Sequence, residues 1–199
     1  MINQTDYFDE LYKNNDDPWE YEQRWYERRK RQICLSLLLK SQYDNVLEIG
    51  CSNGVFSEQL ARRAKHLTSL DANAKAVQIA QKRLDSLPHV QVIQKRIPEQ
   101  FPAGSFDLIV ISEIMYYLQP SELSELIHKV ENGLTPQGIV LCCHWRYPIE
   151  GFALKGEDVH QVLRQQFSLN HYLNLNDPDF IIDLWSKDST TLAAKEGLL

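Results

Sequence analysis

One stretch decides the fold class of this chain: Leu47-Glu48-Ile49-Gly50-Cys51-Ser52-Asn53-Gly54-Val55-Phe56. It joins an apolar run, typical of a buried strand, to a helical segment through a loop between two glycines. Gly50 permits the sharp turn after the strand, and Gly54 lets a ligand or the next helix approach the backbone closely. Such a strand–loop–helix unit is typical of a parallel sheet whose ligand binds at the carboxyl ends of the strands.

The spacing of the glycines narrows the class of ligand. The loop reads G-x-x-x-G and lacks the third glycine of a dinucleotide fingerprint, so NAD and FAD are disfavoured. No Lys-Ser or Lys-Thr pair follows, so the loop is not a P-loop. Asp71 ends the next predicted strand about twenty residues later, where a carboxylate hydrogen-bonds ribose hydroxyls. The loop and Asp71 together predict a nucleoside ligand; the alternative is a plain turn with an Asp that caps the next helix.

Outward from this loop, apolar runs and helical patterns alternate along the chain. Apolar runs predict parallel strands at 45–49, 67–70, 90–93, 107–112 and 139–144. Amphipathic patterns predict helices at 57–63, 74–84, 121–132 and 157–166. Residues 167–175 and 180–186 predict two more strands, joined by a turn that permits only an antiparallel hairpin. The predicted fold class is α/β: a doubly wound, mostly parallel, seven-stranded sheet with an antiparallel hairpin at one edge.

The composition is that of one globular domain. The 199 residues are 43% hydrophobic and 24% charged, which excludes bulk disorder. We expect a single domain over residues 1–199, with an N-terminal helical cap at 1–40, a ligand-binding core at 44–186 and a tail at 187–199.

Charge, apolar runs and cysteines restrict partners and compartment. The formal net charge of -6 disfavours a nucleic-acid partner held by a broad basic surface. No apolar run reaches the roughly 20 residues of a membrane span, so we expect no membrane segment. Residues 1–6 lack the basic and apolar regions of a signal peptide, so we expect a cytoplasmic protein. The four cysteines form no CxxC pair and no metal-ligand spacing, so we expect reduced thiols and no metal.

Two motifs of the core give the chain a resemblance to a known family. Residues 48–56, with Asp71 at the next strand end, and residues 106–113 (F-D-L-I-V-I-S-E) resemble the class I S-adenosylmethionine (SAM)-dependent methyltransferases. The resemblance covers residues 44–145 and implies a Rossmann-like fold, SAM as cofactor and S-adenosylhomocysteine (SAH) as product. It implies cofactor contacts from Glu48, Gly50, Cys51, Gly54, Asp71, Ala72, Arg96, Ile97 and Ser112. The chain departs from the family at Lys95 and Arg96, where many members carry an Asp that accepts from adenine.

Further motifs are similar to the narrower family of NodS-like methyltransferases. They are Asp17-Pro18-Trp19, residues 25–31 (W-Y-E-R-R-K-R), residues 112–118 (S-E-I-M-Y-Y-L) and residues 144–148 (H-W-R-Y-P) with Gly151. This resemblance extends over residues 7–165 and implies N-methylation of an amine on a sugar-like or other polar small molecule, because that family N-methylates the glucosamine of a chitin-type oligosaccharide. Two other readings stay open: a catalytically silent SAM-binding protein, and a nicotinamide-dependent oxidoreductase. Either a monomer or a homodimer is compatible with the sequence.

Residues that follow the fourth and fifth predicted strands are candidates for the acceptor side, because ligands bind at the carboxyl ends of such strands. Those assigned to substrate binding are Tyr116, Tyr117, Trp145 and Arg146. An amine must be neutral to attack, so we expect Glu113 or His144 to take its proton, with His144 facing the cleft. His160, on the next predicted helix, is a further candidate on the substrate side.

The head of the chain predicts two helices, Asp6–Tyr12 and Trp19–Leu39. Basic residues 28–31 share the second helix with glutamates that can neutralise them through i,i+4 pairs, which disfavours a nucleic-acid arm. Two interpretations remain open. The segment is a solvated helix face, or it is a lid in which Trp19 and Tyr26 cover the cofactor and an arginine of residues 28–31 holds its carboxylate; of these arginines we assign Arg31.

Overall fold

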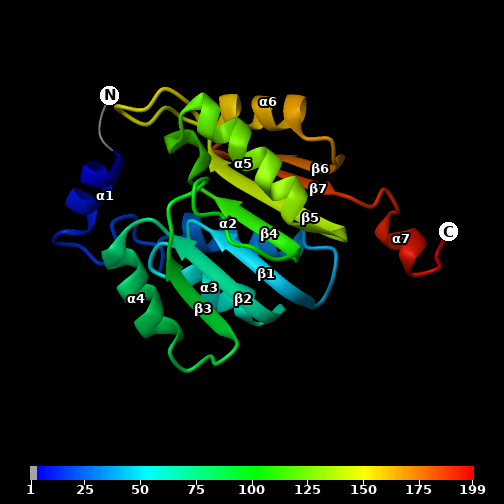
Figure 1. Ribbon diagram of the computed structural model, residues 1–199, viewed down its shortest axis with the longest axis horizontal. Helices are drawn as coiled ribbons and strands as arrows, with labels where there is room; N and C mark the ends of the chain where they lie inside the picture. The colour runs from blue at the N-terminus through cyan, green and yellow to red at the C-terminus, as the bar shows by residue number, and fades with distance from the viewer. Residues whose placement is uncertain (1–3) are drawn as a thin grey trace.

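The computed structural model, which describes residues 4–199, is built around one seven-stranded sheet (Figure 1). The strand order is β3-β2-β1-β4-β5-β7-β6. The strands are β1 (Tyr43–Ile49), β2 (Ala64–Asp71), β3 (Val90–Gln94), β4 (Phe106–Ser112), β5 (Leu134–Trp145), β6 (Asn170–Asn176) and β7 (Phe180–Ser186). β1 to β5 pair in parallel, whereas β7 is antiparallel to both β5 and β6. The predicted sheet, with its antiparallel hairpin at one edge, is confirmed.

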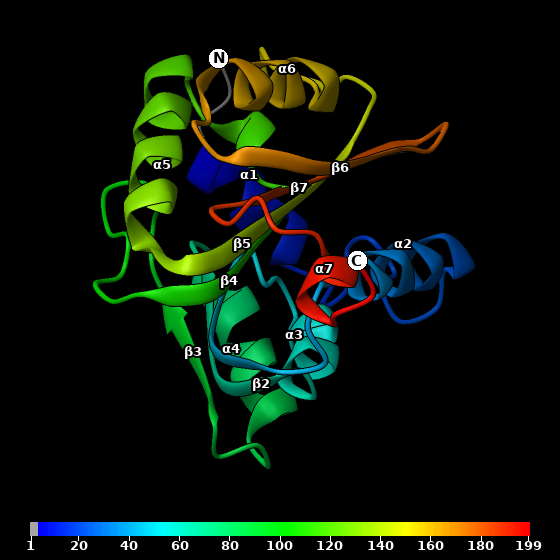
Figure 2. The same cartoon turned by 90° about the vertical axis from the view of Figure 1, so that its right-hand side faces the viewer.

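Helices cover both faces of this sheet (Figure 2). They are α1 (Gln4–Tyr12), α2 (Trp25–Ser36), α3 (Val55–Ala61), α4 (Ala74–Leu84), α5 (Pro120–Gly133), α6 (Gly156–Gln166) and α7 (Leu192–Lys195), with a 3₁₀ turn η1 at Met115–Tyr117. Alternate residues of β4 face the two layers. Ile109 and Ile111 pack with α5 and α6, whereas Leu108 and Val110 pack with α2 and α3. This burial on both faces explains why β4 reads as a continuous apolar run.

The segment before α2 differs from the prediction. One helix over Trp19–Leu39 is wrong at both ends, because α2 spans Trp25–Ser36. Asp17 accepts a hydrogen bond from the backbone N–H of Tyr21 at 2.9 Å, which closes a compact turn in front of the helix. Glu20 has a φ of 56° in that turn, which an α-helix does not accommodate.

Smaller differences lie at the ends of other elements. β5 begins at Leu134 rather than Ile139, because Leu134 pairs with Phe106 across a register shift in the ladder to β4. Neither η1 nor α7 is predicted, because elements of 3 and 4 residues carry no periodic signal. Residues 1–3 lie outside the described residues. They belong to the predicted cap and to the segment 1–6, which we expect not to be a signal peptide.

Within residues 4–199, no helix is long and apolar enough to cross a membrane. The cysteines Cys34, Cys51, Cys142 and Cys143 are buried free thiols. In the same part of the chain, no group of His, Cys, Asp and Glu side chains has an arrangement suited to a metal ion.

Candidate active site

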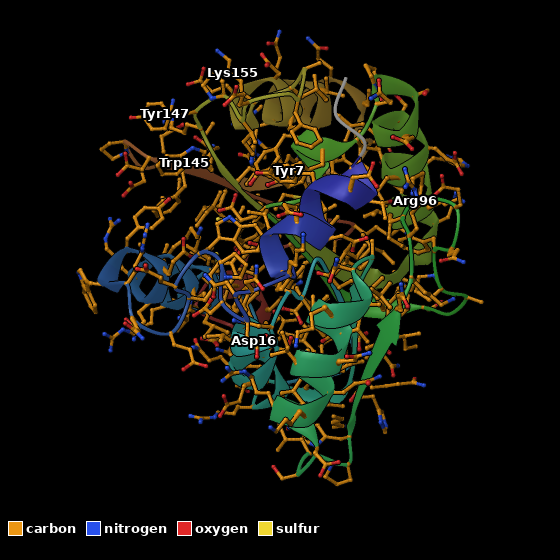
Figure 3. All side chains as sticks on the ribbon, turned by 90° about the vertical axis from the view of Figure 1, so that its left-hand side faces the viewer. Tyr7, Asp16, Arg96, Trp145, Tyr147 and Lys155 are labelled. Atoms are coloured by element: carbon orange, nitrogen blue, oxygen red, sulfur yellow. The ribbon has the colours of Figure 1, made fainter. Side chains whose placement is uncertain are left out.

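A cavity of about 490 Å³ lies at the carboxyl ends of the parallel strands. Residues at the ends of β1, β2 and β4, and just after β3, form its floor: Ile49, Gly50, Leu70, Asp71, Ala72, Lys95, Arg96, Ile97, Ser112 and Glu113. Its roof comes from α1, α2 and the turn between them: Tyr7, Phe8, Tyr12, Trp19, Tyr21, Arg24, Tyr26, Glu27 and Lys30. Figure 3 looks onto this edge of the sheet, where α1 and Tyr7 lie between Trp145 and Arg96. The cavity thus occupies the place predicted for a ligand.

The two glycines of the first loop are required by close packing. Gly50 has a φ of +86°, and a Cβ there would lie 2.2 Å from Cγ2 of Ile114. Gly54 has a φ of +80°, and a Cβ there would lie 3.1 Å from Cα and Cβ of Ala80 on α4. The close neighbour of Gly54 is therefore α4, whereas the sequence predicts a ligand or the helix that directly follows the loop; Gly54 does not line the cavity.

Asp71 is fixed to this loop by backbone donors. Its Oδ2 accepts from the N–H of Ser52 at 2.8 Å, and its Oδ1 accepts from the N–H of Asn73 at 2.9 Å. Burial raises the pKa of Asp71, and these backbone hydrogen bonds oppose the shift. Each carboxylate oxygen has a second lone pair, so Asp71 can accept further hydrogen bonds on the side that lines the cavity.

Arg31 presents buried donors beside the same loop. Its side chain is 6% exposed, and its Nη2 donates to the backbone oxygen of Tyr21 at 2.7 Å. Within residues 4–199, its Nε and Nη1 have no hydrogen-bond partner, and the carboxylate of Glu27 lies 3.9 Å from Nη1. Arg31 borders a void of about 40 Å³ between α2 and the loop, which Gly50 and Ser52 also line. A buried guanidinium with unpaired N–H groups is suited to an anionic ligand group.

A buried ion pair lies where the cavity and the void meet. Lys30 Nζ lies 2.6 Å from Glu113 Oε1 and 3.2 Å from Glu27 Oε1. Glu113 Oε2 accepts from the hydroxyl of Tyr116 at 2.6 Å and from the backbone N–H of Trp145 at 2.7 Å. Burial opposes the charge on Lys30, but the carboxylates of Glu113 and Glu27 outweigh it and raise the pKa of Lys30 well above its ordinary value. The two carboxylates therefore stabilise the charged form of Lys30 in this wall.

The chain matches the family described as nodulation protein S (NodS) over residues 5–146. It belongs to the NodS family. The nodulation protein S of Sinorhizobium fredii (strain NBRC 101917 / NGR234) is 30% identical over 125 residues, which cover 62% of this chain and 58% of the relative. That of Rhizobium tropici is 32% identical over 120 residues, which cover 60% and 50%. The matched region thus spans between half and three fifths of the length of these curated relatives.

Solved structures show the same relationship. The N-methyltransferase NodS from Bradyrhizobium japonicum WM9, in complex with SAH, is 27% identical, with a TM-score of 0.84 over 93% of this chain and 98% of that one. A structure from Pseudomonas syringae is 42% identical, with a TM-score of 0.73 over 82% and 99% of the two chains. The resemblance to NodS-like methyltransferases and the class I methyltransferase fold are confirmed.

Most residues predicted to hold the cofactor border the cavity or the void. They are Trp19, Arg31, Gly50, Cys51, Asp71, Ala72, Arg96, Ile97 and Ser112. Glu48 lies beneath the loop instead, with 1% exposure, and accepts from the hydroxyls of Ser57 and Ser69 at 2.5 and 2.7 Å. Burial raises the pKa of Glu48 to about 7, although the two hydroxyl donors oppose the shift. Glu48 therefore supports the loop from below.

On the acceptor side, Glu113, Tyr116, Tyr117 and Trp145 line the cavity, but three predicted residues, His144, Arg146 and His160, do not. His160 is 0% exposed on α6. The expectation that His144 faces the cleft is wrong, because its ring is fully buried and lies on the α6 side of β5. Strand alternation along β5 explains this, since His144 and Trp145 are consecutive: His144 contacts His160 of α6, while Trp145 packs edge-on against Tyr26 of α2. Arg146 points outward, where its Nη2 pairs with Glu157 at 2.8 Å.

Several residues of the cavity wall are missing from the prediction. α1 contributes Tyr7, Phe8 and Tyr12, and α2 contributes Lys30. A signal for α2 is present in the sequence: Glu27, Lys30, Arg31 and Cys34 recur at helical spacing and form the buried side of that helix. Because three of the four are charged, the pattern resembles a solvated face, and only the structure shows that it is turned inward.

Proposed function

We propose that the protein is a SAM-dependent methyltransferase that methylates the nitrogen of an amine on a polar, sugar-like acceptor. The observation that carries this proposal is that Arg31 and Asp71, which form no ion pair with each other within residues 4–199, both lie beside the glycine loop. Arg31 offers the N–H groups of two buried nitrogen atoms, Nε and Nη1, to a carboxylate, and Asp71 offers oxygens to neighbouring hydroxyls. SAM carries both partner groups, a methionyl carboxylate and a ribose, whereas a nicotinamide dinucleotide has no carboxylate.

We call Arg31, the Gly50 loop, Asp71 and residues 95–97 the cofactor half of the cavity. Gly50 and Ser112 line both the cavity and the void, so they would contact the methionyl chain between ribose and carboxylate. Ala72, Arg96 and Ile97 would flank the adenine. Bound SAM supplies an electrophilic methyl group on a sulfonium sulfur. Trp19 and the other aromatic side chains of the roof keep water from that group.

We call Lys30, Glu113, Tyr116, Tyr117 and Trp145 the acceptor half. Polar groups and flat aromatic surface are the mixture that holds sugars, whereas a lipid would call for a mostly aliphatic wall. A carboxylate has about four acceptor positions, and Lys30, Tyr116 and Trp145 fill three of those on Glu113. The remaining position would accept an N–H of the acceptor amine and orient its lone pair toward the methyl group.

Lys30 would favour the reactive form of that amine. An ammonium ion has no lone pair and cannot attack, so the amine must first give its proton to water. The carboxylates of Glu113 and Glu27 attract an ammonium ion and raise the pKa of a bound amine; the positive charge of Lys30 opposes them and so shifts the balance toward the neutral amine. The methylation rate is therefore expected to rise with pH through the pKa of the bound amine and then to level off.

A labelled-methyl assay tests this function. The protein is incubated with methyl-labelled SAM and a panel of amino sugars, each matched with its N-acetylated and its hydroxyl analogue, and products are identified by mass spectrometry. We expect label on the nitrogen of a free amino sugar and none on either analogue. A product methylated on oxygen or carbon contradicts the acceptor class. SAH binding without turnover on any acceptor favours a catalytically silent SAM-binding protein, and failure to bind SAH contradicts the whole proposal.

We also propose the domain bounds, location, acceptor and oligomeric state expected from the sequence. They are a cap over residues 1–40, a core over 44–186 and a tail over 187–199 within one domain. They also include a cytoplasmic location, a small-molecule acceptor rather than a nucleic acid, and a monomer or homodimer. The net charge of -6 supports the exclusion of a nucleic acid.

A further inference from the structure

A chain of buried polar side chains lies behind the acceptor half. It runs from Asp183 on β7, through His160 on α6, to His144 on β5, and each of the three is 0% exposed. His160 Nδ1 lies 2.7 Å from Asp183 Oδ2, and His160 Nε2 lies 3.1 Å from His144 Nδ1. At the far end, the backbone N–H of Met115 donates to His144 Nε2 over 3.4 Å. The chain thus joins the edge hairpin to the first residue of η1.

Asp183 sets the direction of the hydrogen bonds from one end. Its carboxylate also accepts from Arg164 Nη2 at 2.8 Å and from Asn174 Nδ2 at 2.7 Å. Burial opposes the charge on Asp183, but hydrogen bonds from His160, His171 and Asn174 outweigh it and lower the pKa of Asp183 to about 2. An ionised carboxylate only accepts hydrogen bonds, so His160 must carry a proton on Nδ1.

Met115 sets the same direction from the other end. A backbone N–H only donates, so His144 Nε2 must be an unprotonated acceptor. The proton of a neutral His144 ring then sits on Nδ1 and is donated to Nε2 of His160, which must also be unprotonated. Both ends therefore require the same arrangement: two neutral rings, each with its proton on Nδ1.

The surrounding charges are compatible with neutral rings. The cations near them are Lys30 on α2 and Arg164 on α6, and the anions are Glu113 after β4 and Asp183 on β7. The cations oppose a second ring proton and the anions favour it. Burial is the largest effect and lowers the pKa of both histidines.

The segment that the chain holds is η1, which carries two tyrosines of the acceptor half. The first N–H groups of a helical turn have no partner within the turn, and no side chain at the N-cap position of η1 supplies one. His144 Nε2 supplies it for Met115. The ring of Tyr116 packs edge-on against His144 at 5.4 Å between centroids, while its hydroxyl donates to Glu113. A displaced His144 would therefore shift Tyr116 relative to Glu113.

We propose that His144, His160 and Asp183 form a positioning chain that holds η1, and with it Tyr116 and Glu113, in place at the acceptor site. None of the three transfers a proton during the reaction. This replaces the role of proton acceptor predicted for His144, whose ring does not line the cavity. The kcat measurements below rest on the proposed function, whereas the NMR measurement does not.

Two amide substitutions at His144 separate positioning from proton transfer. The amide of Gln reaches the place of Nε2 and can accept from the Met115 N–H, whereas the amide of Asn reaches only the place of Nδ1. We expect His144→Gln to keep kcat within about threefold and His144→Asn to lose about tenfold, with SAH affinity unchanged in both. A proton relay needs an ionisable ring, so equal loss of activity in the two variants would overturn the proposal.

Nitrogen-15 NMR of the histidine rings tests the chain in the unsubstituted protein, without an acceptor and even if neither variant folds. Ring nitrogen shifts distinguish the two neutral tautomers from each other and from the charged ring. We expect His144 and His160 to be neutral with the proton on Nδ1 from about pH 6 to about pH 8. A charged ring, or a proton on Nε2 of either residue, would overturn the positioning chain. Neither result bears on whether SAH binds, so the proposed function is tested separately.

Discussion

The two halves of the cavity are held together in different ways. In the cofactor half, Asp71 is fixed by backbone N–H groups of Ser52 and Asn73, close to it in the sheet and in the chain. In the acceptor half, Glu113 is fixed by Lys30 of α2, far away in sequence, and by η1 and the end of β5. The placement of Asp71 thus depends on local backbone geometry, whereas the placement of Glu113 depends on a buried charge that tertiary structure must neutralise.

The largest effect on stability is expected from Lys30→Met, which removes the cation of the buried ion pairs in the acceptor half. Glu113 and Glu27 would remain as buried carboxylates without their cation, so we expect the free energy of unfolding to fall by about 4 kcal/mol in chemical denaturation. Arg28→Met is the matched control, because Arg28 is exposed on the same helix and donates to a backbone oxygen at the surface. Adding Glu113→Gln to Lys30→Met should restore part of the loss, and no recovery would contradict the ion-pair account.

The pH dependence of stability tests how Glu48, beneath the loop of the cofactor half, responds to burial. Burial raises its folded-state pKa from 4.5 to about 7, so the folded state binds this proton more tightly than the unfolded state. The free energy of unfolding should therefore fall as pH rises from about 4.5 to about 7 and level off above. We expect Glu48→Gln to lack this decline and to be more stable than the natural protein at pH 8, by up to about 3 kcal/mol. Equal pH dependence in the two proteins would show that Glu48 titrates normally.

Asp71→Ala probes how the cofactor half binds its ligand. The substitution removes the carboxylate that would accept from the ribose hydroxyls and frees the N–H groups of Ser52 and Asn73. We expect SAH affinity, measured by calorimetry, to fall about a hundredfold. Asp71→Asn keeps one oxygen acceptor, so its SAH affinity should lie between that of the natural protein and that of Asp71→Ala. An unchanged dissociation constant in Asp71→Ala would place the ribose elsewhere.

The same contrast explains what the sequence could predict. The glycine loop, Asp71 and the order of strands and helices follow from short-range signals: glycine spacing, apolar runs and amphipathic periodicity. The start of α2 does not, because one side chain, Asp17, closes a turn where the helical pattern continues. Periodicity measures which residues share a face, and it is blind to such a local hydrogen bond.

The acceptor half is harder to predict because its contacts join distant parts of the chain. The place of His144 at a strand end indicates the correct edge of the sheet, but the turn after β4 and the packing of α6 decide which face holds the cavity. Glu113 has a φ of 61°, and this turn brings Tyr116 onto its carboxylate although simple alternation separates the two. Lys30 lies 83 positions from Glu113, beyond the reach of any local pattern.

Calorimetry with two ligands tests most directly whether the buried guanidinium of Arg31 holds the carboxylate of the cofactor. SAH carries that carboxylate, whereas 5′-methylthioadenosine has the same nucleoside and thioether without it. We predict that Arg31→Met weakens SAH binding about thirtyfold and leaves 5′-methylthioadenosine binding unchanged. Equal weakening of both ligands, or no change in SAH affinity, would contradict this role of Arg31.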